Sequence, residues 1–223
     1  MTKYRLRYFD ARGWAEVSRQ LFKLADVEFE DIRTTFEEWP AMKDSTPFGK
    51  LPLLEVDGKI LVQSWAIARY LAKEFGSFLI LFSFEKKTFP GYAGKNKWEE
   101  AWVDAIADQL KDYLLQEAKD YFMAVRFGGK PEEIEEKKQT VLIPARNRFF
   151  KFLVDKLKES GSGYLMPSGL TWADLLIAEH IFTMSKLWPQ STEGFQELED
   201  LKTRVYSHPK LKEWIEKRPD TAF

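Results

Sequence analysis

The sequence predicts two units of different fold class, an α/β unit over residues 1–76 and an all-helical unit over residues 93–223. Strand and helix signals alternate in the first unit, whereas strand signals stop after Ala93. Between the units, residues 77–92 are rich in Phe and show neither period. With 223 residues, 44% of them hydrophobic and 15% aromatic, the chain can bury the core of one large or two small domains.

The first unit is predicted from short local patterns. Tyr4, Leu6 and Tyr8 alternate on one face, which indicates a strand, and Asp57-Gly58 is a strong signal for a two-residue hairpin turn. Ser64 is expected to cap the last helix of this unit. In chain order, the predicted strand, helix, strand, short helix, hairpin and helix span Tyr4–Phe9, 15–25, 29–33, Trp39–Lys43, Leu53–Val56 with Lys59–Val62, and 64–75. This order predicts a parallel strand pair followed by an antiparallel hairpin.

The second unit is predicted to be helical throughout. Residues 99–125 form one long helical pattern, and Pro131 suits the first turn of a helix that runs to about residue 160. Pro144 is expected to kink or interrupt that helix. Residues 171–174 have the pattern of a capping box before an apolar run, and Pro209–Lys217 is predicted to be the last helix.

The composition argues against several classes of site and partner. With 34 Lys and Arg against 35 Asp and Glu, the net charge is −1, so we expect neither nucleic acid nor an anionic membrane as a partner. The chain has no Cys, and His180 and His208 stand without an HExxH or GxSxG motif, so we expect no metal site and no catalytic triad. No secretory signal and no membrane-spanning run are visible, which favours a cytoplasmic protein.

Two segments of the first unit are candidates for a ligand site. The segment 47–54 suits an irregular turn, and a cis Leu51–Pro52 bond there would turn the Leu51 amide outward to pair with a peptide ligand. The alternative is an ordinary turn that leads into the hairpin. Ser64, preceded by Gln63, offers a hydroxyl and N–H groups at a helix start, where a carboxylate binds. The alternative is a helix cap alone.

Three further side chains suit an anionic ligand. Tyr8 lies where the first strand ends, and its hydroxyl can donate a hydrogen bond to an anion. The alternative is a core tyrosine. Trp39 and Lys43 share one helix face, so they either hold an acidic ligand or cover the edge of the core.

Together these features resemble a glutathione transferase, most closely the sigma class and its nematode relatives, a group related to haematopoietic prostaglandin D synthase. The resemblance covers nearly the whole chain outside residues 77–92. It implies a thioredoxin-like N-terminal domain over residues 1–76, a linker with an atypical insertion over 77–92 and an all-α C-terminal domain over 93–223. The residues that carry it are Tyr8, Trp39, Lys43, residues 47–52, Gln63, Ser64, residues 67–71, residues 103–105 and the helix start at 171–174.

The resemblance implies a glutathione site in which the substrate, not the protein, supplies the thiol. Tyr8 would donate its hydroxyl to the glutathione sulfur and stabilise the thiolate. The other implied contacts are Leu51 beside Pro52 for the cysteinyl part, Trp39, Lys43 and Lys50 for the glycyl end, Gln63 and Ser64 for the γ-glutamyl end, and Asp112, reaching across a homodimer, for the glutamyl ammonium.

Three departures from the family pattern concern the acceptor and the linker. Trp14 stands where the sigma class often has a basic residue, so we expect a reshaped acceptor pocket. Lys111 stands where some prostaglandin isomerases have one of several aspartates that bind a divalent metal, so that metal is not expected. Residues 77–92 have three possible interpretations: an exposed loop, a helix extension or interface segment, and a sequence artefact. We expect this segment to lie outside the glutathione site. The acceptor pocket is expected to involve Phe9, Trp14, Leu114 and Phe223.

The combined features predict a cytoplasmic, homodimeric glutathione transferase that conjugates glutathione to apolar electrophiles, as in detoxification. Three alternatives remain open at this stage: a glutathione-dependent prostaglandin-H2 D-isomerase, a non-catalytic carrier of haem or another apolar ligand, and a structural protein of the lens-crystallin type.

Overall fold

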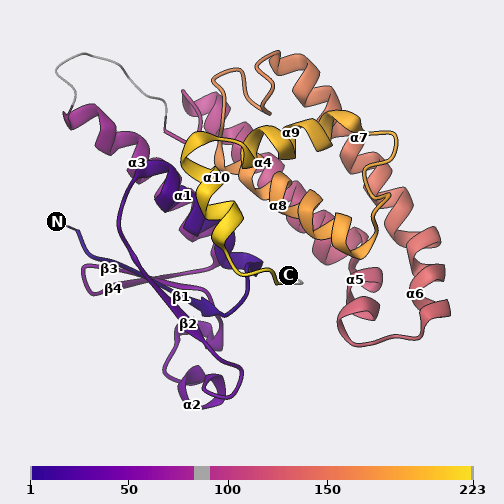
Figure 1. Ribbon diagram of the computed structural model, residues 1–223, viewed down its shortest axis with the longest axis horizontal. Coiled ribbons are helices and arrows are strands. Elements are labelled where there is room, and N and C mark those ends of the chain that lie inside the picture. Colours follow the sequence, from indigo (N-terminus) through magenta and orange to yellow (C-terminus); the bar gives the residue numbers. More distant parts are fainter. Residues whose placement is uncertain (1, 83–90, 222–223) are drawn as a thin grey trace.

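A four-stranded mixed sheet forms the centre of the first unit in the computed structural model, which describes residues 2–82 and 91–221 (Figure 1). The strands, in the spatial order β2-β1-β3-β4, are β1 (Tyr4–Phe9), β2 (Glu30–Thr34), β3 (Leu53–Val56) and β4 (Lys59–Val62). β1 pairs parallel with β2 and antiparallel with β3, which pairs antiparallel with β4. The predicted parallel pair and hairpin are therefore confirmed, although β2 lies one residue later than expected.

Two helices, α1 (Glu16–Ala25) and α3 (Ser64–Phe82), pack together with the sheet. Every second residue of β1, beginning with Tyr4, is buried against them. The Tyr4 ring meets the rings of Phe22 on α1 and Phe75 on α3, with centroid distances of 5.3 and 5.9 Å. These ring contacts hold the start of β1 against α1 and α3. In the view of Figure 1 the short helix α2 (Trp39–Lys43) lies on the other side of the sheet from α1 and α3.

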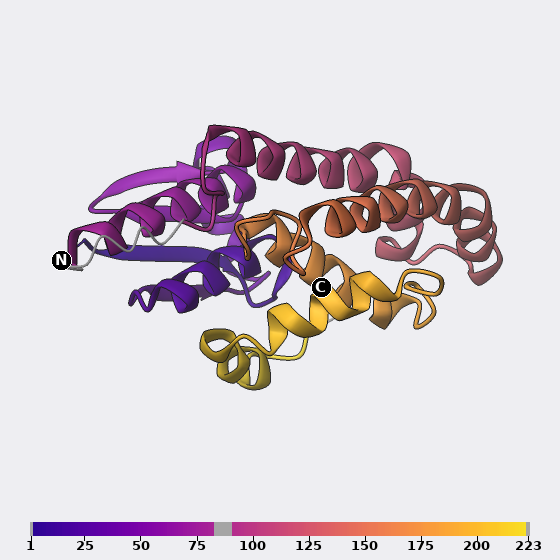
Figure 2. The ribbon, with the colours of Figure 1, turned by 90° about the horizontal axis from the view of Figure 1, so that it is seen from above.

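The second unit consists of helices, as predicted, with α8 at its centre. Figure 2 shows the long helices of this unit lying alongside one another. Residues 171–181 of the chain are all buried, and α8 contacts α4 and α9 within its own unit and α1 in the first unit. The helices are α4 (Lys97–Asp112), α5 (Lys119–Arg126), α6 (Pro131–Lys137), α7 (Ile143–Ser160), α8 (Trp172–Leu187), α9 (Gln196–Tyr206) and α10 (Pro209–Lys217). The sequence analysis did not predict α9.

The single helix expected over residues 99–125 is wrong, because a π-helical segment, Tyr113–Glu117, separates α4 from α5. The N–H of Ala118 donates to the carbonyl of Tyr113 at 2.8 Å, five residues back. The extra residue in this turn lets Tyr113, Ala118 and Tyr121 all face the core. Spacings of three and four alone do not reveal such an insertion.

The interruption expected at Pro144 is confirmed. A second π-helical segment, Lys138–Leu142, divides the expected helix into α6 and α7, and Pro144 lies in the first turn of α7. Because proline has no N–H, it cannot complete a regular hydrogen bond to the carbonyl four residues back.

α3 ends at Phe82, later than the expected end at Phe75, so it enters the segment 77–92. Residues 83–90 of that segment lie outside the described residues. The division of the chain at residues 76 and 93 therefore stays a prediction.

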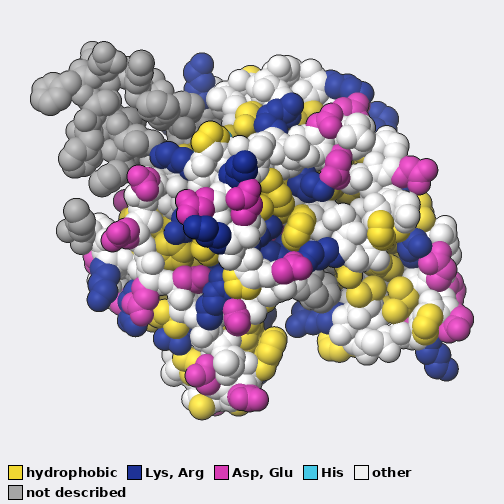
Figure 3. Space-filling model, viewed as in Figure 1, with side chains coloured by type: hydrophobic (Ala, Val, Ile, Leu, Met, Phe, Trp, Pro, Cys, Tyr) yellow, Lys and Arg dark blue, Asp and Glu magenta, His cyan; other side chains and the backbone are white. Residues whose placement is uncertain are grey.

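The surface carries both signs of charge. In Figure 3 basic and acidic side chains alternate over the visible face, and the lower outline is notched between the lobe with α2 and the lobe with α5 and α6. Within residues 2–82 and 91–221, no helix combines the length and the apolar character needed to cross a membrane.

The capping box expected at residues 171–174 is confirmed. The carboxylate of Asp174 accepts hydrogen bonds from the Thr171 N–H and hydroxyl, both at 2.7 Å, and from the Leu165 N–H at 2.8 Å. Thr171 and Asp174 are both buried. Burial raises the pKa of Asp174 to about 6, despite the hydrogen bonds that act in the other direction. This box sets where α8 begins.

We predict that Thr171→Val lowers the free energy of unfolding by about 1 kcal/mol, because it removes the hydroxyl from the cap. Thr171→Ser, which keeps the hydroxyl, should lose much less. Chemical denaturation of both variants checks this. Equal loss in the two variants would assign the effect to packing and not to the cap.

Candidate functional site

Tyr8 lies one residue before the end of β1, and 8% of its side chain is exposed. Burial raises the pKa of its phenol above the ordinary value of 10.0, while a main-chain hydrogen bond from Trp14 and the charges of Arg19 and Arg126 partly oppose this. The hydroxyl is therefore protonated at neutral pH. A protonated phenol at this place can donate a hydrogen bond to an anion.

Gly13 lets the chain approach the Tyr8 hydroxyl. Residues 10–14, which we call the 10–14 turn, lead from β1 towards α1, and Gly13 has a φ of +39° there. A Cβ added at Gly13 would lie 2.6 Å from Tyr8 Oη and 2.8 Å from its Cε1. This close approach brings the Trp14 N–H to the hydroxyl. The sequence analysis missed this contact, although a glycine soon after the strand that carries Tyr8 was a usable signal.

The turn before β3 contains the expected cis bond. Leu51–Pro52 is cis, Pro52 is buried and Leu51 is half-buried. A Cβ added at Gly49 would lie 3.5 Å from Lys43 Cε, so the Lys43 side chain runs along this turn. Two of the segments expected to bind glutathione, α2 and the turn 47–52, are thus adjacent.

Aromatic rings connect Trp39 to Tyr8. The Phe9 ring meets the rings of Tyr8 and Trp39 edge-on, each at a centroid distance of 5.6 Å. Phe36, which is 77% exposed, stacks on Phe9 at 4.7 Å. The sequence analysis missed Phe36, because a single aromatic residue in a polar loop has no periodic signal.

The expectation that Ser64 is the N-cap of α3 is wrong by one residue. The carbonyl of Gln63 accepts the first helical hydrogen bond, from Ile67 N–H at 2.9 Å, so Gln63 is the N-cap and Ser64 is the first helical residue. Gln63 has a φ of +72°, which turns the chain sharply into the helix. Ser64 still lies at the positive end of the α3 dipole.

Trp65 joins the two units beside this helix start. Its ring meets the Trp14 ring edge-on at 6.0 Å, and the Lys111 Nζ of α4 lies 5.8 Å from its centre. The start of α3, the 10–14 turn and α4 therefore meet at one place. The sequence analysis missed Trp65 because it follows the helix start and reads as a core residue.

The remaining predicted residues are less constrained. Lys50 and Asp112 are exposed, and Asp112 is the last residue of α4. Leu114 is half-buried in the π-helical segment, and Phe223 lies outside the described residues. Within the described part of the chain, no group of three His, Asp or Glu residues is arranged to hold a metal ion. What each of these side chains binds stays a prediction.

A mixed sheet with a cis-proline turn before its third strand, a buried tyrosine on its first strand and an attached helical unit define the glutathione transferases as a class. The family models agree: the glutathione S-transferase N-terminal domain matches residues 4–73 and the C-terminal domain matches residues 116–218. The chain belongs to the glutathione S-transferase family and is a glutathione transferase. The resemblance and the thioredoxin-like fold are thereby confirmed.

The relatives are mainly nematode proteins. The chain is 45% identical over 225 residues to probable glutathione S-transferase 5 of Caenorhabditis elegans, with both chains fully covered. It is 47% identical to a solved Nu-class transferase from Haemonchus contortus, with a TM-score of 0.86 and both chains fully covered. A transferase from Necator americanus described as monomeric is 46% identical, with a TM-score of 0.86 and coverage of 99% and 100%. The prostaglandin synthase D of Nilaparvata lugens is 32% identical, with a TM-score of 0.81 and coverage of 98% and 100%. The sigma-class assignment is not confirmed.

We predict that Gly13→Ala abolishes most conjugating activity, because its Cβ displaces the Tyr8 hydroxyl. Gly58→Ala is the matched control: Gly58 also has a positive φ, +82°, but its Cβ would meet no atom within 4 Å. Both variants should lose some stability from backbone strain. Steady-state kinetics and thermal melts check this, and equal activity in the two variants would contradict the role of Gly13.

Proposed function

We propose that this transferase conjugates the glutathione thiolate to apolar electrophiles in the cytoplasm, with detoxification as its role. The observation that carries the proposal is the buried Tyr8 hydroxyl on a strand that pairs with β3, directly after the cis-proline turn. A thiol has an ordinary pKa of about 8.5, so few molecules are ionised at neutral pH. A phenol O–H that donates to the sulfur stabilises the thiolate and lowers that pKa.

Glutathione is proposed to lie across three segments of the first unit. Its cysteinyl part pairs with Leu51 beside Pro52, and its γ-glutamyl carboxylate lies at Gln63 and Ser64, where the helix dipole favours an anion. Its glycyl carboxylate lies near Trp39, Lys43 and Lys50. The adjacency of Lys43 to the turn 47–52 supports this arrangement, since one extended peptide can reach both.

The acceptor is proposed to bind between the units, against Phe9, Trp14, Leu114 and Phe223. Trp14 is 40% exposed and its ring meets the Trp65 ring edge-on. It therefore offers an exposed aromatic surface close to Tyr8. Such a surface suits planar apolar electrophiles. Lys111, which lies beside Trp65, stands where the resemblance places one of several metal-binding aspartates, and this cation disfavours metal-stimulated isomerase activity.

Retention on immobilised glutathione, followed by a conjugation assay with a chromogenic electrophile, tests the function directly. Binding with turnover supports the transferase. Binding without turnover would favour a carrier of apolar ligands, and isomerisation of a prostaglandin endoperoxide without conjugation would favour the isomerase.

We predict that Tyr8→Phe keeps the fold and glutathione binding but lowers kcat at neutral pH by about 10²–10³, the usual effect of losing one donor to an anion. The pH at which kcat/KM levels off should rise, because the thiol pKa is no longer depressed. A spectroscopic titration of the bound thiolate measures this, and an unchanged thiol pKa would contradict the role of Tyr8.

We predict that Ser64→Ala weakens glutathione binding by about 1.5–3 kcal/mol, the value of a hydrogen bond to a charged group. Because Gln63 is the N-cap, the loss of folding stability should be smaller than the loss of binding. Calorimetric binding and thermal melts separate the two. A large drop in stability with unchanged affinity would show that Ser64 serves the helix alone.

We propose further that the active species is a homodimer in which Asp112 reaches the glutamyl ammonium of glutathione in the partner subunit. Asp112→Asn is predicted to weaken glutathione affinity without changing the melting temperature, because Asp112 is exposed. Asp120→Asn, which removes the same charge at an exposed position outside the proposed site, is the control. Analytical ultracentrifugation that finds a monomer with full glutathione affinity would contradict this assignment.

A further inference from the structure

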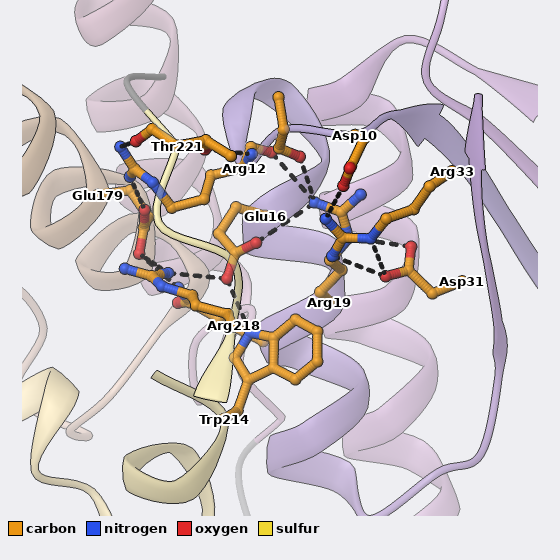
Figure 4. Close-up of polar contacts among 12 residues, drawn as sticks. Asp10, Arg12, Glu16, Arg19, Asp31, Arg33, Glu179, Trp214, Arg218 and Thr221 are labelled. Carbon is orange, nitrogen blue, oxygen red and sulfur yellow. Dashed lines mark hydrogen bonds and ion pairs between the residues drawn. The ribbon is translucent and has the colours of Figure 1, made fainter. Parts of the chain in front are cut away.

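Glu179 on α8 is a buried carboxylate at which charges from both units meet (Figure 4). Its Oε2 accepts a hydrogen bond from Arg12 Nη1 at 2.8 Å. Its Oε1 accepts from Gln20 Nε2, the Tyr206 hydroxyl and Arg218 Nη1, each at 2.6 Å. A carboxylate held by this many donors has one position and orientation in the fold.

Arg12 connects this carboxylate to the 10–14 turn. Apart from the bond to Glu179, its main-chain N–H donates to Thr221 Oγ1 and its Nη2 to the Thr221 carbonyl, both at 3.1 Å. Arg19 Nη1 donates to the carbonyls of Ala11 and Arg12 at 2.8 and 3.3 Å. The first half of the turn is thus held by side chains of α1 and α8 and by the chain after α10.

The second half of the same turn contacts Tyr8. Gly13 lies against the Tyr8 ring, and the Trp14 N–H hydrogen-bonds to its oxygen. Arg12 and Trp14 are two residues apart, so a shift of the Arg12 main chain displaces the Trp14 N–H. Loss of that N–H removes a donor from the oxygen that is proposed to hold the thiolate.

We propose that Glu179 is a positioning residue for Tyr8, which acts through Arg12 to hold the Trp14 N–H on the tyrosine oxygen. It touches neither glutathione nor the reacting atoms. The inference rests on the proposed function of Tyr8 and adds to it a residue of the helical unit, 167 positions along the chain from Arg12.

The sign of the effect separates positioning from plain electrostatics. Glu179→Gln removes the negative charge that balances Arg12 and Arg218. By charge alone, the uncompensated arginines make nearby anions easier to form. If Glu179 instead positions the turn, the same substitution weakens the hydrogen bond to Tyr8, so the bound thiol becomes harder to ionise. The two mechanisms therefore move the thiol pKa in opposite directions.

The test compares Glu179→Gln with Asp174→Asn, which changes another buried carboxylate of α8 that caps the helix and has no bond to the 10–14 turn. We expect Glu179→Gln to raise the thiol pKa of bound glutathione and to lower turnover at neutral pH by about tenfold. This loss is smaller than that from removing a direct donor to the anion. Asp174→Asn should lower the melting temperature and leave the thiol pKa unchanged. A lowered or unchanged thiol pKa in Glu179→Gln overturns the proposal.

A milder variant covers the case in which Glu179→Gln does not fold. Thr221→Val removes the oxygen that accepts the Arg12 N–H near the chain end, and we expect the same direction of change with smaller size. An unchanged thiol pKa in this folded variant, with Glu179→Gln unfolded, counts against the proposal.

Amide hydrogen exchange at Trp14 tests the positioning without glutathione. Protection of this amide should fall in Glu179→Gln and persist in Asp174→Asn. Suppose that wild-type protein shows no thiolate signal, while protection of the Trp14 amide falls in Glu179→Gln and persists in Asp174→Asn. The proposed function then fails and the positioning stands. If the thiolate signal is normal and Trp14 protection is unchanged in Glu179→Gln, the positioning fails alone.

Discussion

The hydrogen bonds around Glu179 connect the 10–14 turn and α1 with the helical unit and the chain after α10, and through Arg12 they hold the first half of that turn. The buried cluster contains Arg12, Arg19 and Arg218 with Glu16, Glu179 and the partly buried Asp31 as counter-charges. Burial acts to lower the Arg218 pKa, but Glu179 and Glu16 outweigh it and hold that pKa above its usual value. Such a cluster contributes little net stability, yet removing one member typically costs about 3–5 kcal/mol, because it leaves a buried charge unpaired. Its main consequence is one relative placement of the two units.

The same placement bears on how a chain without cysteine carries out thiol chemistry. In the proposed mechanism the substrate brings the sulfur and the protein supplies the phenol of Tyr8, whose pKa burial raises further above neutral pH. The sheet core fixes Tyr8, the 10–14 turn places a donor on its oxygen, and the first turn of α3 lies next to Trp14 through Trp65. Each of these parts is held by contacts with another part of the fold. A group that is held in place before substrate binds does not need to reorganise during the reaction.

The features that the sequence predicted are those with local causes. The alternation in β1, the Asp57-Gly58 hairpin, the cis Leu51–Pro52 bond and the capping box at Thr171 all depend on neighbours a few residues away. The π-helical segments escaped notice because their apolar spacing resembles that of a normal helix. The Glu179 cluster escaped notice because charged residues far apart in the chain give no sign that they will be buried together. Trp65 and Phe36 join the site through ring contacts that only the fold creates.

The central claim is that Tyr8 donates to the glutathione sulfur while its oxygen accepts the Trp14 N–H. A crystal structure of the glutathione complex tests this most directly. The account predicts the sulfur within hydrogen-bonding distance of Tyr8 Oη, with the Trp14 N–H still directed at that oxygen. A sulfur bound elsewhere, with Tyr8 facing only protein atoms, would contradict it.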